Sequence, residues 1–521
     1  MPSFSTEIAV IGGGATGLGI AWDACLRGYK VLVLEQGDLG EGTSGRYHGL
    51  LHSGARYAVS DPASAADCSA ENSILRRIAA PYIEDTGGLF LLLPGDPPGY
   101  VPDWLAGCRQ ARVSTEEISP AEALRREPAL PHALVRAFGV VDAALDSFEL
   151  LHALSRSIED AGGQVWIRRE VLAFARQGRR VIGVLAEDRR TGETVRIQSE
   201  LVINAAGPWV GKVAGRAGIR LPLALSRGAM LALASRPVHT VINRCAFPGD
   251  GDIVVPIGTV AVLGTTDEAV RSPERTLPEG REIHSLLSLG QALLPDLPRY
   301  RPLRAWVGVR PLYRPSQARS AATRELPRAH HILDHETLHD VPGLITVLGG
   351  KLTTYRRMAE QTVDLAEERL GRRRGCTTAT THLDSGRMRR FHTLPARLRS
   401  LSATSPADSS AEIVCECELV ARADIARALE AAPTTNLDDL RRDLRLGMGP
   451  CQAAFCGYRA AGIVAQTVPH APPDGGLLDF LEERWRGTRV LTWGPMLRQL
   501  EFQRRVSLEV LGAAPARRGR T

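Results

Sequence analysis

EIAVIGGGATGLGIAWDACLRGYKVLVLE, residues 7–35, is the stretch that decides the fold. It begins with a short apolar run, continues through a glycine-rich turn into a segment of helical periodicity, and ends with a second apolar run. This order of strand, turn, helix and strand is typical of a βαβ unit. We therefore expect an α/β fold that opens with two parallel strands joined by a helix.

Three glycines in this stretch indicate a dinucleotide site. Gly12, Gly14 and Gly17 fit G-x-G-x-x-G. The first allows a tight turn, the second lets the backbone approach a pyrophosphate, and the third lets the helix pack on the strand. The phosphates would then lie at a helix N-terminus, where unpaired N–H groups favour anions. Glu35 closes the second strand, where a carboxylate can accept hydrogen bonds from ribose hydroxyls.

Two further segments favour FAD over NAD. Residues 41–57, EGTSGRYHGLLHSGARY, would leave the βαβ unit at the carboxyl ends of its strands, where a dinucleotide lies. This loop interleaves its glycines with Thr43, Ser44, Arg46, His48 and His52, and we assign the first three of these to the cofactor. VLGGKLTTYRRMAE, residues 347–360, predicts a second strand, glycine pair and helix, which suits a flavin whose N1–C2=O edge becomes negative on reduction. From this turn we assign to the cofactor Gly349, Gly350, Leu352 and Thr353.

Length and composition bound the remaining possibilities. A chain of 521 residues exceeds what one hydrophobic core organises, so two or three domains are expected. The net charge of +6 is spread over arginine-rich helical stretches with few interleaved aromatics, which argues against nucleic-acid binding. The N-terminus carries no pattern for secretion, and no apolar run approaches the roughly 20 residues of a spanning helix. We expect a cytoplasmic protein whose membrane contact is peripheral.

Composition along the chain suggests four regions. Residues 1–371 read as one oxidoreductase unit with interlaced cofactor and substrate parts. Residues 372–411 shift to Arg, Thr, Ser and Pro, which is typical of a linker. Residues 412–470 form a compact cysteine-bearing unit, and residues 471–521 a helical extension with a basic tail.

Four of the nine cysteines form a candidate metal site. Five are scattered, as small buried hydrophobes are in a reducing compartment: Cys25, Cys68, Cys108, Cys245 and Cys376. The others form two close pairs, Cys415 with Cys417 and Cys451 with Cys456. Four thiolates serve zinc or an iron–sulfur cluster. Structural zinc more often uses two Cys-x2-Cys pairs, whereas this spacing resembles the small bacterioferritin-associated-ferredoxin-like (BFD-like) [2Fe–2S] domain. We expect a helix to begin at Cys451, with its N–H groups facing the cluster; zinc and unliganded thiols remain alternatives.

Short motifs in a shared order carry a family resemblance. They are VIGGGATG, GRYHGLLHSGARYAV, VINAAG, VINRC, LGTTD, VGVRPL, LGGKLTTYR and LEERWRG. With them the chain resembles the FAD-dependent glycerol-3-phosphate dehydrogenases, in particular the large catalytic component of the anaerobic, multi-subunit bacterial enzyme. The resemblance implies a D-amino-acid-oxidase type of fold, in which a Rossmann-like FAD half meets an antiparallel sheet that caps the substrate. It also implies two partner subunits, one that contains flavin and one that carries iron–sulfur centres and anchors the complex to the membrane.

The resemblance also implies site residues. It assigns catalysis or substrate binding to Arg56 and Tyr57 of the GARY motif, Arg310 of VRPL, Lys351 and Thr353 of GGKLTT, and an arginine before LDH. Spacing favours Arg328 over Arg324 for the last of these. A phosphate dianion on a small polyol offers little apolar area, so arginine forks are suited to bind it. His52 and Lys351 are both candidates for the group that accepts the hydroxyl proton.

The expected function is oxidation of sn-glycerol 3-phosphate to dihydroxyacetone phosphate. Electrons would pass through FAD and a [2Fe–2S] cluster to partner subunits and the quinone pool, at the cytoplasmic face of the inner membrane. A one-electron carrier beside a flavin lets the electrons leave singly. Two alternatives stay open: an FAD-dependent amine or 2-hydroxy-acid oxidase or dehydrogenase, and a redox protein without catalysis. The stretch at 494–520 is either a docking element for a partner or an ordinary packed helix with a solvated tail.

Overall fold

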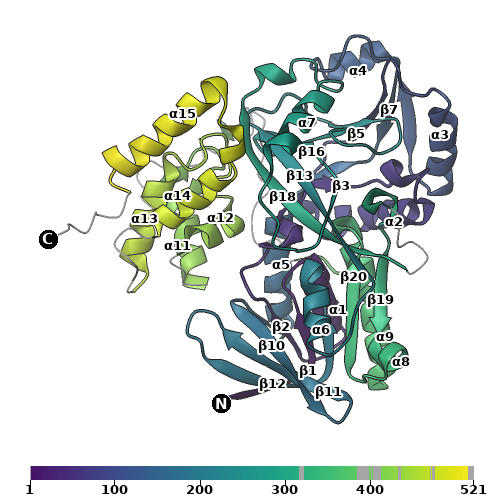
Figure 1. The fold of residues 1–521 in the computed structure, drawn as a ribbon, viewed down its shortest axis with the longest axis vertical. Helices are drawn as coiled ribbons and strands as arrows, with labels where there is room; N and C mark the ends of the chain where they lie inside the picture. The colour runs from purple at the N-terminus through teal and green to yellow at the C-terminus, as the bar shows by residue number, and fades with distance from the viewer. Residues whose placement is uncertain are drawn as a thin grey trace.

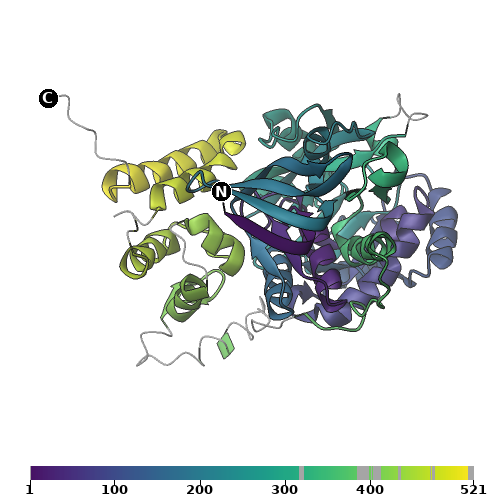
Figure 2. The same ribbon diagram turned by 90° about the horizontal axis from the view of Figure 1, so that it is seen from below.

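The structure is a computed structural model, and Figures 1 and 2 show how its parts are arranged. It describes residues 2–315, 322–383, 398–399, 402, 412–431, 436–469, 471 and 476–513. Two large sheets form the body of the molecule, and a group of C-terminal helices stands at one side of it (Figure 1). Most of the expected linker, and the whole tail at 514–521, lie outside the described residues.

The first sheet is the cofactor half. Its central path runs in the order β10 (Arg169–Gln177), β11 (Arg180–Asp188), β12 (Thr194–Asn204), β1 (Ser3–Ile11), β2 (Val31–Leu34) and β9 (Gln164–Trp166). β20 (Leu344–Gly349) joins β12 on a branch and pairs with β19 (His330–Asp334). β12, β1, β2 and β9 are mutually parallel, as the βαβ pattern predicts.

Both faces of β1 are buried, which explains its unbroken apolar run. Ile8 and Val10 pack into the core beneath three helices: α1 (Ala15–Leu26), α5 (Ser147–Asp160) and α9 (Tyr355–Leu370). Ala9 and Ile11 pack on the opposite side against α6 (Val210–Gly215). Successive side chains of a strand point to opposite faces, so a strand covered on both sides needs apolar residues at every position.

The second sheet has nine strands and forms the cap. Its path runs β17 (Glu268–Val270), β13 (Leu223–Leu233), β16 (Val260–Gly264), β15 (Ile253–Ile257), β14 (Val241–Arg244), β5 (Gly88–Leu92), β7 (Arg136–Val140) and β6 (Thr115–Ile118), and β18 (Pro302–Tyr313) pairs with β13. The pairs are antiparallel except β14 with β5. Smaller elements around it are α2 (Pro62–Ile78), α3 (Tyr100–Gln110), α4 (Pro120–Arg126), α7 (Gly280–Gly290), α8 (His335–His339), β3 (Leu50–Leu51), β4 (Ile83–Glu84) and β8 (Ala143–Leu145).

Strand β18 has two different faces. Ala305 and Val307 are buried in the core beneath α7. The half-buried residues Arg304, Trp306 and Arg310 alternate with them and therefore share the opposite face of the strand. One strand thus places basic side chains at two points along the same side of the cap.

The C-terminal helices have a core of their own. They are α11 (Arg422–Ala431), α12 (Leu437–Leu444), α13 (Cys456–Thr467), α14 (Leu477–Arg486) and α15 (Gly494–Arg505), and they accompany a small pair of strands, β21 (Ile413–Cys415) and β22 (Val420–Ala421). Ile425, Leu440, Val464 and Phe480 are buried at their centre. In the part of the chain that the structure describes, no helix is long and apolar enough to cross a bilayer.

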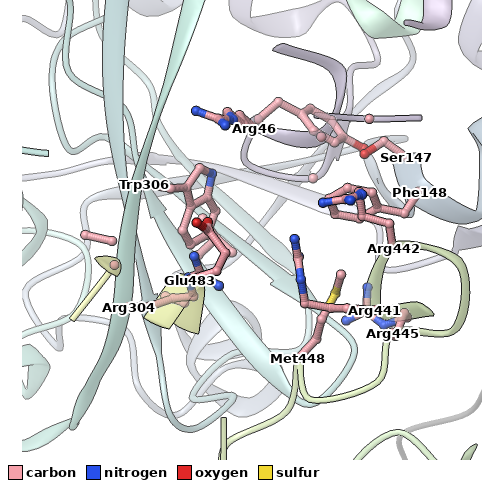
Figure 3. A pocket seen from close by; sticks show the side chains of 18 of the residues that line it. Arg46, Ser147, Phe148, Arg304, Trp306, Arg441, Arg442, Arg445, Met448 and Glu483 are labelled. Carbon is pink, nitrogen blue, oxygen red and sulfur yellow. The ribbon is translucent and has the colours of Figure 1, made fainter. Parts of the chain in front are cut away.

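Ion pairs with little solvent exposure join these helices to the cofactor half. Arg442 Nε lies 2.5 Å from Asp38 Oδ2, and side chains of both residues are about 5% exposed. Arg445 Nη1 lies 2.6 Å from Asp146 Oδ2, a carboxylate that also caps the N-terminus of α5. Beside these pairs, a pocket of about 350 Å³ lies between α12, α14 and the end of β18 (Figure 3).

The start of the expected linker is packed against the body. Leu383 is buried, and its N–H donates to the carbonyl of Ile78 at 2.9 Å. The Arg374 N–H donates to the carboxylate of Glu367 at 2.8 Å. The described residues 372–383 therefore lie along the oxidoreductase unit instead of reaching straight to the C-terminal helices.

Replacing Asp38 by Asn should loosen the C-terminal helices from the body. The substitution removes the charge of Asp38 and leaves Arg442 buried. This costs about 3 kcal/mol of stability, in the lower part of the range for breaking a buried pair, because Asp439 still contacts the guanidinium. Hydrogen exchange of the amides of α12 should become faster by on the order of a hundredfold. The exposed Asp160→Asn change should leave exchange unaltered, and equal exchange in both variants would contradict the proposed role of the pair.

Candidate active site and cluster site

A glycine-lined cavity of about 260 Å³ lies at the carboxyl ends of β1 and β2. Gly12 has a φ of +114°, and a Cβ there would lie 2.5 Å from the carbonyl oxygen of Ala205. A Cβ on Gly17 would lie 1.9 Å from the carbonyl oxygen of Gly12. Only glycine fits at these two points, so the turn has the shape that brings backbone N–H groups to a pyrophosphate.

Side chains predicted to bind the cofactor form hydrogen bonds with this turn and with the elements next to it. The Glu35 carboxylate accepts hydrogen bonds from the N–H groups of Gly13 at 2.7 Å and Gly37 at 2.8 Å, while burial raises its pKa. Ser44 Oγ accepts from the Ala15 N–H at 3.0 Å, in the first turn of α1. Thr43 Oγ1 donates to the carbonyl of Val309 on β18 at 2.5 Å. The loop is thereby attached to both halves of the molecule.

The second glycine turn follows β20, as predicted. Gly349 and Gly350 have φ values of +78° and +77°, and a Cβ on either would lie within 2.5 Å of a neighbouring atom. Leu352 packs on the core of the cofactor half. Thr353 is 1% exposed, and its Oγ1 accepts from the His52 N–H at 3.1 Å. Thr353 therefore holds the His52 loop in place, and a direct substrate contact by Thr353 stays a prediction.

The predicted basic residues meet at the inner face of the cap. Arg56 Nη2 lies 2.8 Å from Asp252 Oδ1. Arg310 Nη2 donates to Thr265 Oγ1 at 2.7 Å, and its Nη1 lies 3.4 Å from Asp267 Oδ2. Asp267 also pairs with Arg328.

Lys351 completes this set. Its Nζ donates to the carbonyl of Arg328 at 3.3 Å and lies 4.3 Å from the centre of the Tyr57 ring. The ammonium is thus held between a carbonyl oxygen and an aromatic face, two partners that favour the charged form. The structure brings together all of the predicted residues Arg56, Tyr57, Arg310, Arg328 and Lys351.

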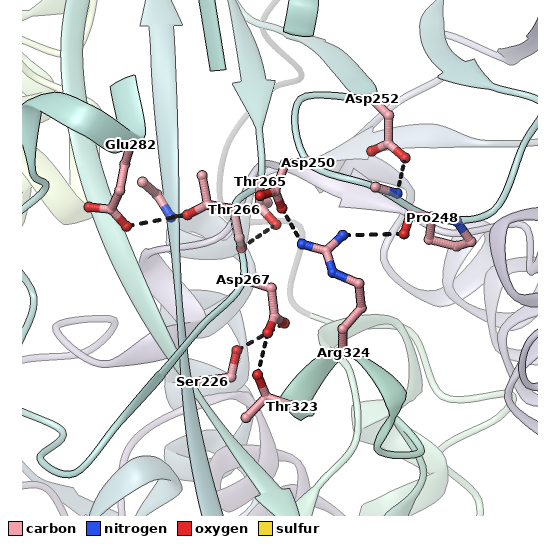
Figure 4. A network of polar contacts seen from close by, with 12 residues as sticks. Ser226, Pro248, Asp250, Asp252, Thr265, Thr266, Asp267, Glu282, Thr323 and Arg324 are labelled. Atoms are coloured by element: carbon pink, nitrogen blue, oxygen red, sulfur yellow. Dashed lines mark hydrogen bonds and ion pairs between the residues drawn. The ribbon is translucent and has the colours of Figure 1, made fainter. Parts of the chain in front are cut away.

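The geometry separates Arg328 from Arg324, the two candidates for the last arginine. Arg328 Nη2 lies 2.9 Å from Asp267 Oδ2, and within the described residues its buried Nη1 has no hydrogen-bond partner. Arg324 instead pairs with Asp250 and donates to the carbonyl of Pro248 at 3.2 Å, in a network around that loop (Figure 4). Arg328 is therefore the one that faces the other cations.

Charge at this site favours a dianion. Arg56, Arg310, Arg328 and Lys351 outnumber by two the carboxylates that form ion pairs with them, Asp252 and Asp267. Burial, together with the neighbouring Arg328, lowers the pKa of Arg310 to about 10, and burial lowers that of Lys351. Both groups remain cations. A bound anion would offset the free energy that their desolvation and their repulsion by neighbouring cations cost.

Two histidines border the cations. Burial, followed by the charges of neighbouring cations, lowers the pKa of His52 well below its ordinary value and that of His48 to about 3. His48 Nδ1 accepts from the Leu50 N–H at 3.1 Å, so its ring can carry a proton only on Nε2. The His52 ring lies 5.2 Å from the Tyr57 ring. Both histidines are neutral at neutral pH.

Sequence reasoning did not assign roles to Asp252 and Asp267. Asp267 ends the LGTTD motif that supported the family resemblance, so its motif was a usable signal. Asp252 lies close to Asp250 just before β15, and nothing in its spacing distinguished it. Both carboxylates orient the predicted arginines, and only the folded chain shows these pairs.

The four predicted cysteines lie together as contacting pairs. Hydrogen bonds link Cys415 with Cys456, and Cys417 with Cys451, and a third links Cys451 with Cys456. Contacts with the neighbouring thiols lower the pKa of Cys415 and Cys451. Among the described residues, no group of three His, Cys, Asp or Glu side chains is arranged to hold one metal ion. Pairs of thiols suit a cluster in which each of two irons takes two cysteines.

Backbone N–H groups surround these thiols. Gly447 and Glu418 donate to Cys415, and Ala453 and Ala454 donate to Cys451. Such N–H groups stabilise an anionic cluster. The expectation that a helix begins at Cys451 is wrong: α13 begins at Cys456, because positive φ angles of 49° at Gln452 and 70° at Ala453 are incompatible with an α-helix. The donors therefore come from a turn.

Comparisons with known proteins agree with this architecture. Residues 7–356 match the family described as FAD dependent oxidoreductase, and residues 413–466 match the BFD-like [2Fe–2S] binding domain. FAD and a [2Fe–2S] cluster are thus the cofactors of the chain, and the predicted fold class is confirmed. The cavity, in which only glycine fits at positions 12 and 17, suits FAD. The thiol pairs with their N–H donors suit the cluster.

Three relatives illustrate the likeness. The chain is 39% identical to the A component of the anaerobic glycerol-3-phosphate dehydrogenase of Escherichia coli K12, over 96% of each chain. It is 39% identical to the A1 component of the enzyme of the same name from Haloferax volcanii, over 95% of this chain and 89% of that one. A solved glycerol-3-phosphate dehydrogenase from Bacillus halodurans shares the fold, with a TM-score of 0.60, 21% identity, and coverage of 97% of this chain and 94% of that one.

Replacing Gly449 by Ala should reduce the cluster content. A Cβ at this position would lie 2.2 Å from the Cβ of Cys417, so one of the two backbones must move and one thiol is displaced. Iron per chain should fall to less than half, while bound FAD is unchanged. The control is Gly462→Ala on α13, where an added methyl meets nothing within 4 Å. Full iron content in Gly449→Ala would show that the thiol geometry tolerates the shift.

Proposed function

Because the chain belongs to the FAD-dependent oxidoreductase family and is 39% identical over nearly its whole length to the A component of an anaerobic glycerol-3-phosphate dehydrogenase, we propose that it oxidises sn-glycerol 3-phosphate to dihydroxyacetone phosphate. The observation that carries the proposal is the surplus of two positive charges beside two neutral histidines. A phosphate dianion balances this surplus. A secondary alcohol next to it needs a neutral base for its proton.

The basic residues bind and orient the substrate in this proposal. Arg310 and Arg328 present fork-shaped donors that suit two oxygens of one phosphate. Arg56, fixed by Asp252, and Lys351, fixed over Tyr57, supply the remaining charges. Asp267 holds the two forks at one point, so that little side-chain entropy is lost when the phosphate binds.

His52 is the proposed acceptor of the hydroxyl proton. It is buried and neutral, whereas Lys351 already donates to the Arg328 carbonyl as an ammonium. The surrounding cations would stabilise negative charge that develops on the substrate oxygen. Gly12, Gly14 and Gly17 with Glu35, together with the Gly349–Gly350 turn, would hold FAD, which would supply the two-electron acceptor.

We further propose that partner proteins dock beside the cluster. Gln503 on α15 donates to the Cys451 carbonyl at 3.4 Å, so this helix lies next to the cysteine loop. Phe455, in the cysteine loop, is 66% exposed, and Phe502, on α15, is 72% exposed. Exposed aromatics close to the cluster suit an interface across which electrons leave. Delivery to the quinone pool, with the chain held peripherally at the inner membrane by its partners, is part of this proposal.

Anaerobic bleaching of the flavin band tests the substrate. Glycerol 3-phosphate should bleach it, and glycerol, glycine and 2-hydroxyglutarate should not, because none of these places a phosphate among the cations. Arg328→Ala should lower kcat/KM by an amount equivalent to about 2–4 kcal/mol, as expected for a charged hydrogen-bonding partner in a desolvated site. The matched control Arg324→Ala, which removes a pair outside this cluster, should cost less than about 1 kcal/mol. Bleaching by glycine alone would overturn the proposal.

Replacing His52 by Asn tests the base. Flavin reduction should slow by about 10²–10⁴-fold, the usual contribution of a general base, with FAD retained. In the parent protein the neutral form of His52 is the active one and its pKa is lowered, so the rate of flavin reduction at saturating substrate should stay level as pH falls through 6.5 and decline only at lower pH. If His52→Asn reacts at nearly the parent rate while Lys351→Met is inactive, the base is Lys351.

A further inference from the structure

A second arginine-rich site lies away from the substrate cluster. It is the pocket of about 350 Å³ between the C-terminal helices and the cap, a volume within the range of small-molecule pockets. Seven arginines and four carboxylates line it. Figure 3 shows Arg46, Arg304 and Arg441 around its open centre. Arg46 also lines the FAD cavity and His48 borders the substrate cations, but Arg304, Arg484 and Trp306 have no role in FAD, substrate or cluster binding described above.

Three of the arginines are already committed to carboxylates. Arg442 pairs with Asp38 and Arg445 with Asp146. Arg441 Nε lies 2.5 Å from Asp438 Oδ1. These pairs balance one another and hold the C-terminal helices on the body.

Two others carry buried N–H groups with no partner. Arg484 is 2% exposed; its Nη2 donates to Gln452 Oε1 at 2.5 Å, but within the described residues its Nε and Nη1 have no hydrogen-bond acceptor. The buried Nε of Arg304 has none either. A desolvated guanidinium without an acceptor is costly. An anion that accepted hydrogen bonds from the unpaired N–H groups of these two arginines would offset that cost.

The charges of these arginines reinforce the geometry. Burial, followed by the charges of Arg304 and Arg441, lowers the pKa of Arg484. Burial and the charge of Arg441 lower the pKa of Arg304 to about 10. Glu483 lines the pocket as well, but it also pairs with Arg486 at 3.0 Å. Burial and the neighbouring arginines therefore together disfavour the charged forms of Arg304 and Arg484.

The cap strands form a largely apolar wall of the pocket, on the same face of β18 as Arg304. Trp306 and Ala232 come from neighbouring strands of the cap, and Val260 and Val262 from β16. Phe148 of α5 lines the side next to the ion pairs. A planar ring fits against such a wall, with its phosphate among the arginines.

We propose that this pocket binds a mononucleotide, a phosphate monoester with a planar heteroaromatic ring, separately from FAD and from the substrate. The phosphate would accept from the free N–H groups of Arg304 and Arg484, and the ring would lie against Trp306. The location couples the ligand to both cofactor sites. Arg46 lines this pocket and the FAD cavity, and Gln452, which holds Arg484, follows the cluster ligand Cys451.

The test uses FAD-loaded, cluster-containing protein and measures binding by calorimetry and by tryptophan fluorescence. AMP and FMN should each be tried, with adenosine and inorganic phosphate as the two separated halves. At least one mononucleotide should bind with a dissociation constant in the micromolar range and quench fluorescence. Adenosine should not bind measurably, and phosphate should bind at least tenfold more weakly.

Variants locate the site. Arg304→Gln and Arg484→Met should each weaken mononucleotide binding by tenfold or more, while FAD and iron contents stay at the parent level. Arg498→Gln, at an exposed position on α15, should bind as the parent does. If Arg484→Met fails to fold, the half-buried Arg304 still decides the question. Absence of binding by both mononucleotides, parent-like binding by Arg304→Gln, or loss of FAD from Arg304→Gln would each overturn the proposal.

Discussion

The contact of two buried arginines with the buried Asp38 and the half-buried Asp146 fixes the relation between the halves of this molecule. Arg442 and Arg445, at the end of α12, insert into the cofactor half at Asp38 and Asp146. Asp38 follows β2, the strand after which Glu35 contacts the dinucleotide turn, and Asp146 caps α5, which covers the same sheet. Because desolvated ion pairs tolerate little displacement, the cysteine loop that follows α12 is held at a set position relative to the flavin.

Glycines and cysteines were the features most readable from the sequence. The two glycine turns lie where strand, turn and helix patterns placed them, because a Cβ at Gly12 or Gly17 meets backbone atoms and the chemistry of the turn is local. The contacting thiols follow from spacing in the same way. The start of α13 was misplaced because positive φ angles at Gln452 and Ala453 leave no mark in composition.

Long-range pairs could not be foreseen. Arg324 and Arg328 differ by four positions in an irregular segment, and only the location of Asp267, some sixty residues earlier, distinguishes their environments. The sequence predicted Thr353 as a ligand residue, but it did not reveal that the Thr353 hydroxyl also supports the His52 backbone. The unmet donors of Arg304 and Arg484 depend on packing between parts of the chain far apart in sequence, which no single-segment pattern records.

The length of strand β18 sets the separation of the two basic sites. Its pairing with β13 is regular from Arg304 to Arg310, six residues or about 20 Å of extended chain. A side chain changes face at every step, so inserting or deleting one residue in this segment would turn one of the two arginines into the core beneath α7. The number of residues in this segment is therefore constrained, even at positions where one apolar residue could replace another. Only a change of two residues would preserve both faces, and it would move the two basic sites apart or together by about 7 Å.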